Sequence, residues 1–234
     1  MIFDAFVVSC EHASHAVPVR WRQPFAATPE VLNTHRAWDP GALTLARYFA
    51  RALKAPLFCG QVTRLLVDLN RRANTRAVFS EFSRRFAPAQ RQHLLHLYHW
   101  PYRVLVQHAV TELLAAGRKV LHLSCHSFTP VLDGKTRQTE IGLLFDPKRP
   151  GENSLCRNWQ QALAAALPTH RTRLNDPYKG TSDGVTTWLR GLFGADQYAG
   201  IELELNQTFA AKPAARWLAV RHALLRTLHS SVRG

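Results

Sequence analysis

Three short apolar stretches each lead directly into side chains that can bind a metal ion or transfer a proton. They cover residues 5–8, 120–124 and 198–205. Each is dominated by aliphatic and aromatic residues, and helix-like segments separate them along the chain. This alternation predicts an α/β fold, with a mainly parallel sheet that helices cover on both faces.

The side chains at the ends of these strands form the main candidate site. His12 follows the first strand and His126 follows the second. Glu202 and Glu204 lie two residues apart on the third strand, and therefore on one of its faces. Parallel strands bring their carboxyl ends to one edge of the sheet, where ligands bind. Because a catalytic zinc takes His and carboxylate ligands and activates a water, the residues predict a metallohydrolase centre. One of the two glutamates would take the proton from that water.

Three residues compete for the place of the third metal ligand: Glu11, Asp39 and His15. For Asp39 the sequence offers a second interpretation. An Asp followed by Pro40 is typical of a helix start, with Asp as the N-cap of a helix over residues 40–53. Both interpretations of Asp39 stay open at this point.

A second group of residues is suited to hold a carboxylate. Short strands are expected at residues 57–59 and 65–67, and Asn70 and Arg71 follow the second of them. Arg64 lies at its start, and an arginine offers a planar fork for a carboxylate. Tyr178 lies in a loop rich in turn-forming residues, of the kind that often carries function. We therefore expect all four side chains to contact substrate.

The stretch of residues 88–116 predicts a long helix that Pro101 should kink or split. Its histidines do not have the HExxH spacing of a zinc site, and we expect them to lie on the surface or in the core. They are His93, His96, His99 and His108.

Length and composition narrow the class of protein. A chain of 234 residues fits a single domain, here expected to cover residues 1–234. No apolar run is long enough to cross a bilayer and the start lacks a basic signal segment, so we expect a cytoplasmic protein with no membrane contact. The formal net charge of +14 favours an anionic partner. Because the basic residues are scattered, we do not expect nucleic acid, and the oligomeric state stays open.

Two other functions fit parts of the pattern. Cys125 could act as the nucleophile of a cysteine-dependent amidase, with His126 or His12 as its base. Adjacent residues of a strand point to opposite faces, which counts against the pair of Cys125 and His126. Alternatively, the chain could be a basic module that binds anions or nucleic acid without catalysis.

Six motifs give the chain a resemblance to a known family. In order along the sequence, they read SCEHAS at 9–14, HRAWDPGA at 35–42, DLNR at 68–71, CHSF at 125–128, NDPYKG at 175–180 and GIELE at 200–204. Together they cover nearly the whole chain and resemble the N-formylglutamate amidohydrolase family. That family is similar to zinc carboxypeptidases and aspartoacylase, which implies a three-layer α/β/α sandwich around a mixed, mainly parallel sheet.

The resemblance also implies an activity and residue roles. The expected reaction is hydrolysis of the amide bond of an N-formyl or N-acyl amino acid, such as N-formylglutamate, by a zinc-activated water. His12 and His126 would bind zinc, and Glu204 would be the general base. Asn70 and Arg71 would hold a carboxylate of a small, acidic substrate. The carboxypeptidase-like motif His-x-x-Glu reads His-Ala-Ser-His at residues 12–15, which leaves the third ligand open between Asp39, Glu11 and His15.

Overall fold

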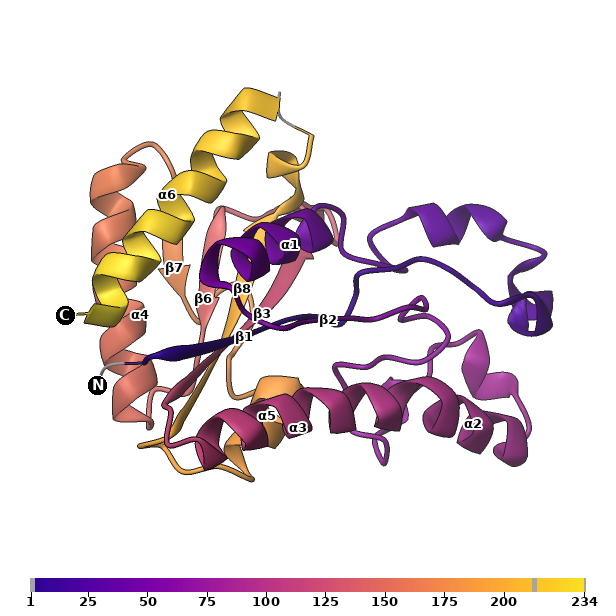
Figure 1. Ribbon diagram of the computed structural model, residues 1–234. Coiled ribbons are helices and arrows are strands. Elements are labelled where there is room, and N and C mark those ends of the chain that lie inside the picture. The colour runs from indigo at the N-terminus through magenta and orange to yellow at the C-terminus, as the bar shows by residue number, and fades with distance from the viewer. Residues whose placement is uncertain (1–2, 212–213, 234) are drawn as a thin grey trace.

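A computed structural model describes residues 3–211 and 214–233 and shows a six-stranded sheet between two layers of helices (Figure 1). The strand order is β2-β1-β3-β8-β6-β7. Strands β2, β1, β3 and β8 are parallel, while β6 runs antiparallel to β8 and β7 runs parallel to β6. Their bounds are β1 (Ala5–Cys10), β2 (Leu57–Cys59), β3 (Val120–Phe128), β6 (Ile141–Leu144), β7 (Thr172–Leu174) and β8 (Tyr198–Asn206). The predicted mixed, mainly parallel sheet is confirmed.

Two hydrophobic cores lie on the two faces of the sheet. Helices α1 (Ala42–Leu53), α4 (Pro150–Ala166) and α6 (Ala214–Arg233) cover one face. Helices α2 (Pro88–Leu94), α3 (Trp100–Ala115) and α5 (Val185–Arg190) lie on the other. The alternation of β1 feeds both cores, since Val8 belongs to the first and Val7 to the second. A small hairpin of β4 (Val131–Leu132) and β5 (Lys135–Thr136) completes the strands.

Two local predictions are wrong for identifiable reasons. The expected strand at residues 65–67 is a turn, in which the Leu66 N–H donates to the carbonyl of Thr63. These residues are buried, and a short apolar run indicates burial without fixing the backbone. Asp39 does not cap a helix: α1 begins after Gly41, whose φ of +86° suits glycine. The Asp39 side chain is thereby available for other contacts.

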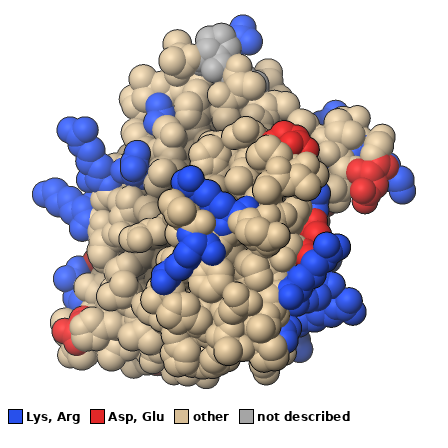
Figure 2. Space-filling model, turned by 90° about the vertical axis from the view of Figure 1, so that its right-hand side faces the viewer, with Lys and Arg blue, Asp and Glu red and all other residues tan. Residues whose placement is uncertain are grey.

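The long helix splits as expected near Pro101, through a π-helical turn, Leu95–His99, that joins α2 to α3. None of the helices in residues 3–211 and 214–233 combines the length and apolarity that a membrane crossing requires. That residues 1–234 form one domain stays a prediction. On the face shown in Figure 2, neutral surface separates the Lys and Arg side chains into several groups.

Candidate active site

A polar pocket of about 220 Å³ lies past the carboxyl end of β1 and along the carboxyl-terminal halves of β3 and β8. The fold brings most of the predicted site residues to its wall. These are His12, Asp39, Arg64, Asn70, Arg71, His126, Tyr178, Glu202 and Glu204. Glu11 and His15 do not line this pocket. As the edge rule for parallel strands predicts, these side chains lie together around one pocket.

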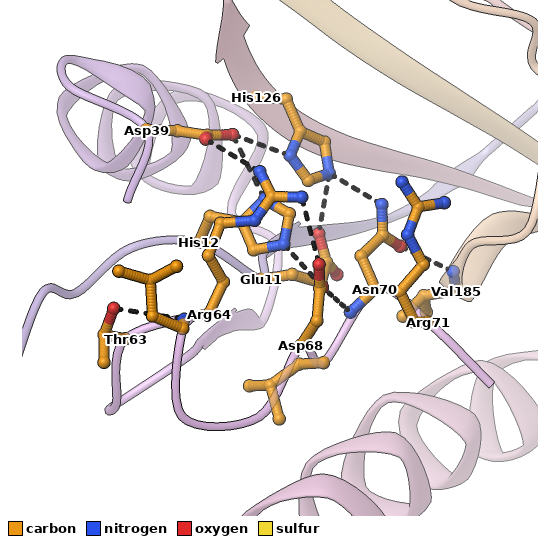
Figure 3. Close-up of polar contacts among 12 residues, drawn as sticks. Glu11, His12, Asp39, Thr63, Arg64, Asp68, Asn70, Arg71, His126 and Val185 are labelled. Atoms are coloured by element: carbon orange, nitrogen blue, oxygen red, sulfur yellow. Dashed lines mark hydrogen bonds and ion pairs between the residues drawn. The ribbon is translucent and has the colours of Figure 1, made fainter. Parts of the chain in front are cut away.

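His12, Asp39 and His126 form a buried group suited to hold a cation, with one ligand atom from each lying within 4.8 Å of the others. Asp39 Oδ2 lies 3.3 Å from His12 Nδ1 and 2.9 Å from His126 Nδ1. Figure 3 shows the two rings and the carboxylate pointing toward one another. Asp39 reaches them from the turn before α1, the position that the N-cap interpretation had assigned to a helix start.

Each histidine contacts a second carboxylate through its other ring nitrogen. His12 Nε2 lies 2.8 Å from Asp68 Oδ1, and His126 Nε2 lies 3.1 Å from Glu11 Oε2. Burial lowers the pKa of His126, but the hydrogen bonds and charges of Asp39 and Glu11 raise it well above its usual range. Burial and Arg64 lower the pKa of His12, but Asp68 and Asp39 outweigh them, so the pKa is raised overall.

A carboxylate that contacts the second nitrogen of a metal-binding histidine is typical of metal sites, where it fixes the orientation of the ring. Two imidazoles and a carboxylate are a donor set that fits zinc.

Glu11 contacts His126 but does not belong to the group of His12, Asp39 and His126 that is suited to hold a cation. Its two carboxylate oxygens accept hydrogen bonds from the Tyr102 hydroxyl (2.9 Å) and the Ser124 hydroxyl (2.6 Å). His15 is exposed, with its ring 5.1 Å from that of Trp38. Of the three candidates for the third ligand, the structure groups Asp39 with the two histidines.

The two glutamates of β8 differ in their surroundings. Glu204 is paired in register with His126 of β3, and its Oε2 is buried with no hydrogen-bond partner in the described part of the chain. Burial raises the pKa of Glu204 to about 7; His126 opposes this rise, while Asp39 and Glu202 add to it. Glu202, by contrast, accepts a hydrogen bond from the Thr186 hydroxyl at 2.8 Å. Glu204 is therefore the carboxylate more available to exchange a proton.

The loop of residues 68–72 carries Arg71 to the pocket wall, and its Asp68 holds a second cation, Arg64. Arg64 pairs with Asp68 Oδ2 at 3.0 Å and lies 3.6 Å from Asp39 Oδ1. Arg71 donates to the carbonyl of Asp183 at 2.7 Å, and Asn70 Oδ1 accepts from the Val185 N–H at 2.7 Å. Arg64 is thus committed to two carboxylates, while Arg71 has a backbone partner and lines the pocket.

The loop of residues 175–184 forms another wall. Asn175 Oδ1 accepts from the Gly180 N–H (2.9 Å) and the Phe145 N–H (3.1 Å), which fixes the loop at its base. Tyr178 is 44% exposed, and its hydroxyl accepts from Arg137 Nη1 at 2.9 Å. Lys179 lines the pocket beside it.

Sequence reasoning missed several pocket and supporting residues. Lys179 directly follows Tyr178 in the NDPYKG segment, so the prediction of Tyr178 as a site residue could have indicated Lys179 as well. The other missed pocket residues are Ser127, Ser182 and Asp183. Ser124 and Tyr102 support Glu11 from β3 and α3, and only the folded chain reveals that contact.

Nucleophilic catalysis by Cys125 does not fit the structure. The thiol is fully buried in the core under α1, on the face of the sheet opposite His126. Burial raises the pKa of this thiol well above its ordinary value, so a thiolate is disfavoured at neutral pH. The alternation argument against this pair is confirmed.

Comparisons with known proteins identify the family to which the chain belongs. The sequence profile described as N-formylglutamate amidohydrolase matches residues 4–211. The structure of gene product Atu2144 from Agrobacterium tumefaciens is similar, with a TM-score of 0.84 and 28% identity over 99% of this chain and 92% of that one. So is an N-formylglutamate amidohydrolase from Ralstonia eutropha JMP134, with a TM-score of 0.75 and 18% identity over 98% and 94% of the two chains. No functionally curated protein sequence matches the chain. The chain belongs to the N-formylglutamate amidohydrolase family, hydrolases that act on non-peptide carbon–nitrogen bonds.

Proposed function

We propose that this protein hydrolyses the amide bond of a small N-formyl or N-acyl amino acid that carries carboxylates, with N-formylglutamate as the first candidate. The observation that carries the proposal is one pocket that combines three elements. It holds the group of His12, Asp39 and His126 that is suited to bind a cation, a carboxylate oxygen of Glu204 with no hydrogen-bond partner among the described residues, and the cations Arg71 and Lys179.

Zinc is the metal that the donor set fits. His12, Asp39 and His126 would hold it, and Asp68 and Glu11 would orient the two rings from behind. When bound, zinc supplies Lewis-acid chemistry, because it lowers the pKa of water toward 7 and polarises a carbonyl group. The buried position of all three donors matches such a role, since a low-dielectric surrounding strengthens the attraction to a cation.

Glu204 is proposed as the general base. It would accept a proton from the attacking water, whose oxygen forms a bond to the acyl carbon. It would then give that proton to the amide nitrogen as the carbon–nitrogen bond breaks, releasing a carboxylic acid and the free amino acid. Two observations support this role: Glu204 lies opposite His126, and its Oε2 has no hydrogen-bond partner within residues 3–211 and 214–233. Glu202, held by Thr186, is the weaker candidate.

The substrate carboxylates would bind to the two loops. Asn70 and Arg71 lie on one wall of the pocket and Lys179 on another, so a molecule between them meets cations on two sides. Arg64 adds positive charge to the same pocket while it remains paired with Asp39 and Asp68. We propose that Tyr178 closes the outer rim of the site.

The test combines metal analysis with a substrate panel. Elemental mass spectrometry of the purified protein should give about one zinc per chain. N-formylglutamate and N-acetylglutamate would be compared with the α,γ-diamide of N-formylglutamate, which carries no carboxylate. We expect hydrolysis of at least one dicarboxylate and none of the diamide. A zinc-loaded protein that hydrolyses no N-acyl amino acid, or hydrolyses the diamide equally well, would contradict the proposal.

A further inference from the structure

The turn between α2 and α3 contacts the loop of residues 68–72, which carries Asn70 and Arg71, through side chains that do not line the pocket. The chain forms a π turn, Leu95–His99, and then enters α3 with Pro101, which has no N–H to donate to the preceding turn. Turns of this kind are rare in proteins, and those that occur are often found at functional sites. Here the turn brings His99 and Arg103 against the backbone of residues 69–71.

Three hydrogen bonds join these two side chains to the loop. His99 Nε2 donates to the carbonyl of Arg71 at 2.7 Å, and Arg103 Nη2 donates to the same carbonyl at 2.9 Å. Arg103 Nε donates to the carbonyl of Leu69 at 3.3 Å. Neither His99 nor Arg103 lines the pocket, whereas Arg71 does. Their effect on substrate must therefore pass through the loop.

This arrangement is unfavourable for stability considered alone. His99 and Arg103 are 1% and 6% exposed. His99 Nδ1 has no hydrogen-bond partner among the described residues, and burial lowers the pKa of this ring to about 4. Arg103 lies over the ring of Trp188, 5.1 Å from its centroid. Burying a cation and an unpaired ring nitrogen costs free energy, and such local conflicts tend to be retained where they serve a site.

The opposite side of the loop is held just as firmly. Asp183 accepts from the Arg71 guanidinium and from the Arg72 N–H, and the Val185 N–H donates to Asn70. Since Trp188 follows on α5, Arg103 connects both supports of the loop. The peptide of Arg71 is therefore fixed between α3 and α5.

We propose that His99 and Arg103 are positioning residues that fix the carbonyl of Arg71 and thereby set the Asn70 amide and Arg71 guanidinium against a substrate carboxylate. The identity of the ligand rests on the proposed function; the support of the loop does not. Loss of the His99 or the Arg103 side chain should weaken the binding of a substrate carboxylate. It should leave Glu204 and the group of His12, Asp39 and His126 in place. The expected kinetic signature is a higher KM with little change in kcat.

The test uses a matched set of variants. His99→Leu removes the donor, and His99→Gln keeps an N–H donor at the end of the side chain. His96→Leu is the control, because His96 lies in the same π turn but is exposed. KM and kcat would be measured with N-formylglutamate, and binding of glutarate by calorimetry. We expect His99→Leu to raise KM and the glutarate Kd about tenfold. His99→Gln should recover most of this loss, and His96→Leu should match the wild type.

Several results would overturn the proposal. They are an unchanged KM with a reduced kcat, a His99→Gln variant as impaired as His99→Leu, or equal effects of His99→Leu and His96→Leu. If the wild type hydrolyses no N-acyl amino acid, the proposed function fails while the glutarate titration still decides the positioning role. Equal glutarate affinity in wild type and variant, or no binding by either, would refute it. Should His99→Leu fail to fold, Arg103→Met with Arg103→Lys as its rescue gives the same comparison.

Discussion

His122 and His126 lie four residues apart on the same face of β3, and both are buried. His122 contacts two hydroxyl groups, with Ser9 Oγ at 2.7 Å and the Tyr198 hydroxyl at 2.8 Å. His126 lies between the carboxylates of Asp39 and Glu11. Burial lowers the pKa of His122 to about 4, whereas the carboxylates reverse the effect of burial on His126. The partners, rather than burial or the strand, separate a core histidine from one suited to bind a metal.

The strongest test of this contrast removes the imidazole of His126. We expect His126→Ala to lose bound zinc and to reduce kcat/KM by at least about 10³-fold, because a catalytic metal contributes several kcal/mol to transition-state stabilisation. Elemental mass spectrometry and steady-state kinetics would measure both. Zinc retained at the wild-type ratio in the folded variant would show that His126 is not a ligand.

Glu204→Gln separates proton transfer from metal binding. The variant keeps the shape of the side chain but cannot accept a proton, so kcat should fall by roughly 10²–10⁴-fold while zinc content is unchanged. Glu202→Gln is the matched control on the same strand, and its loss should be smaller because Thr186 already occupies one oxygen. Equal losses in the two variants would contradict the assignment of the base to Glu204.

Glu11→Gln replaces the carboxylate that contacts His126 and leaves the imidazole of His126 unchanged. We expect zinc affinity to fall by about 10–100-fold, the usual consequence of losing a carboxylate behind a metal-binding histidine. Tyr102→Phe, which removes only one hydrogen bond to Glu11, should have a smaller effect. Competition with a chromogenic chelator would measure the affinities, and unchanged affinity in Glu11→Gln would place Glu11 outside the metal site.

The prediction for His122 concerns the free energy of unfolding rather than activity. Its pKa of about 4 lies below the ordinary value of 6.5, so the unfolded chain binds the extra proton first as pH falls. Stability should therefore decrease from pH 6.5 to pH 4 by up to about 1.4 kcal/mol per pH unit from this group. Urea unfolding should show a shallower pH dependence in His122→Gln than in the wild type. Identical profiles for the wild type and His122→Gln would contradict this expectation.

The sequence was sufficient for the sheet and for much of the pocket wall, because apolar strands that end in polar side chains define an edge. It could not decide the role of Asp39, since an Asp before Pro40 is equally typical of a helix cap. Gly41 resolves that question by starting α1 from a left-handed backbone conformation. Residues 65–67 were assigned to a strand because burial without periodicity does not distinguish a turn. The contact between Glu11 and Tyr102 joins residues 91 positions apart, beyond the reach of any local pattern.

The pairing of β3 with β8 runs from Val120 opposite Tyr198 to Phe128 opposite Asn206, and it places His126 directly opposite Glu204. The distance between these two side chains is thus set by a ladder of backbone hydrogen bonds, independently of the helices that cover the sheet. Deleting or inserting one residue of β8 before Glu202 would bring a neighbouring leucine opposite His126 and turn both glutamates toward the other face. A one-residue change in the length of β8 before Glu202 would therefore remove Glu204 from its place opposite His126, even if every helix kept its contacts with the sheet.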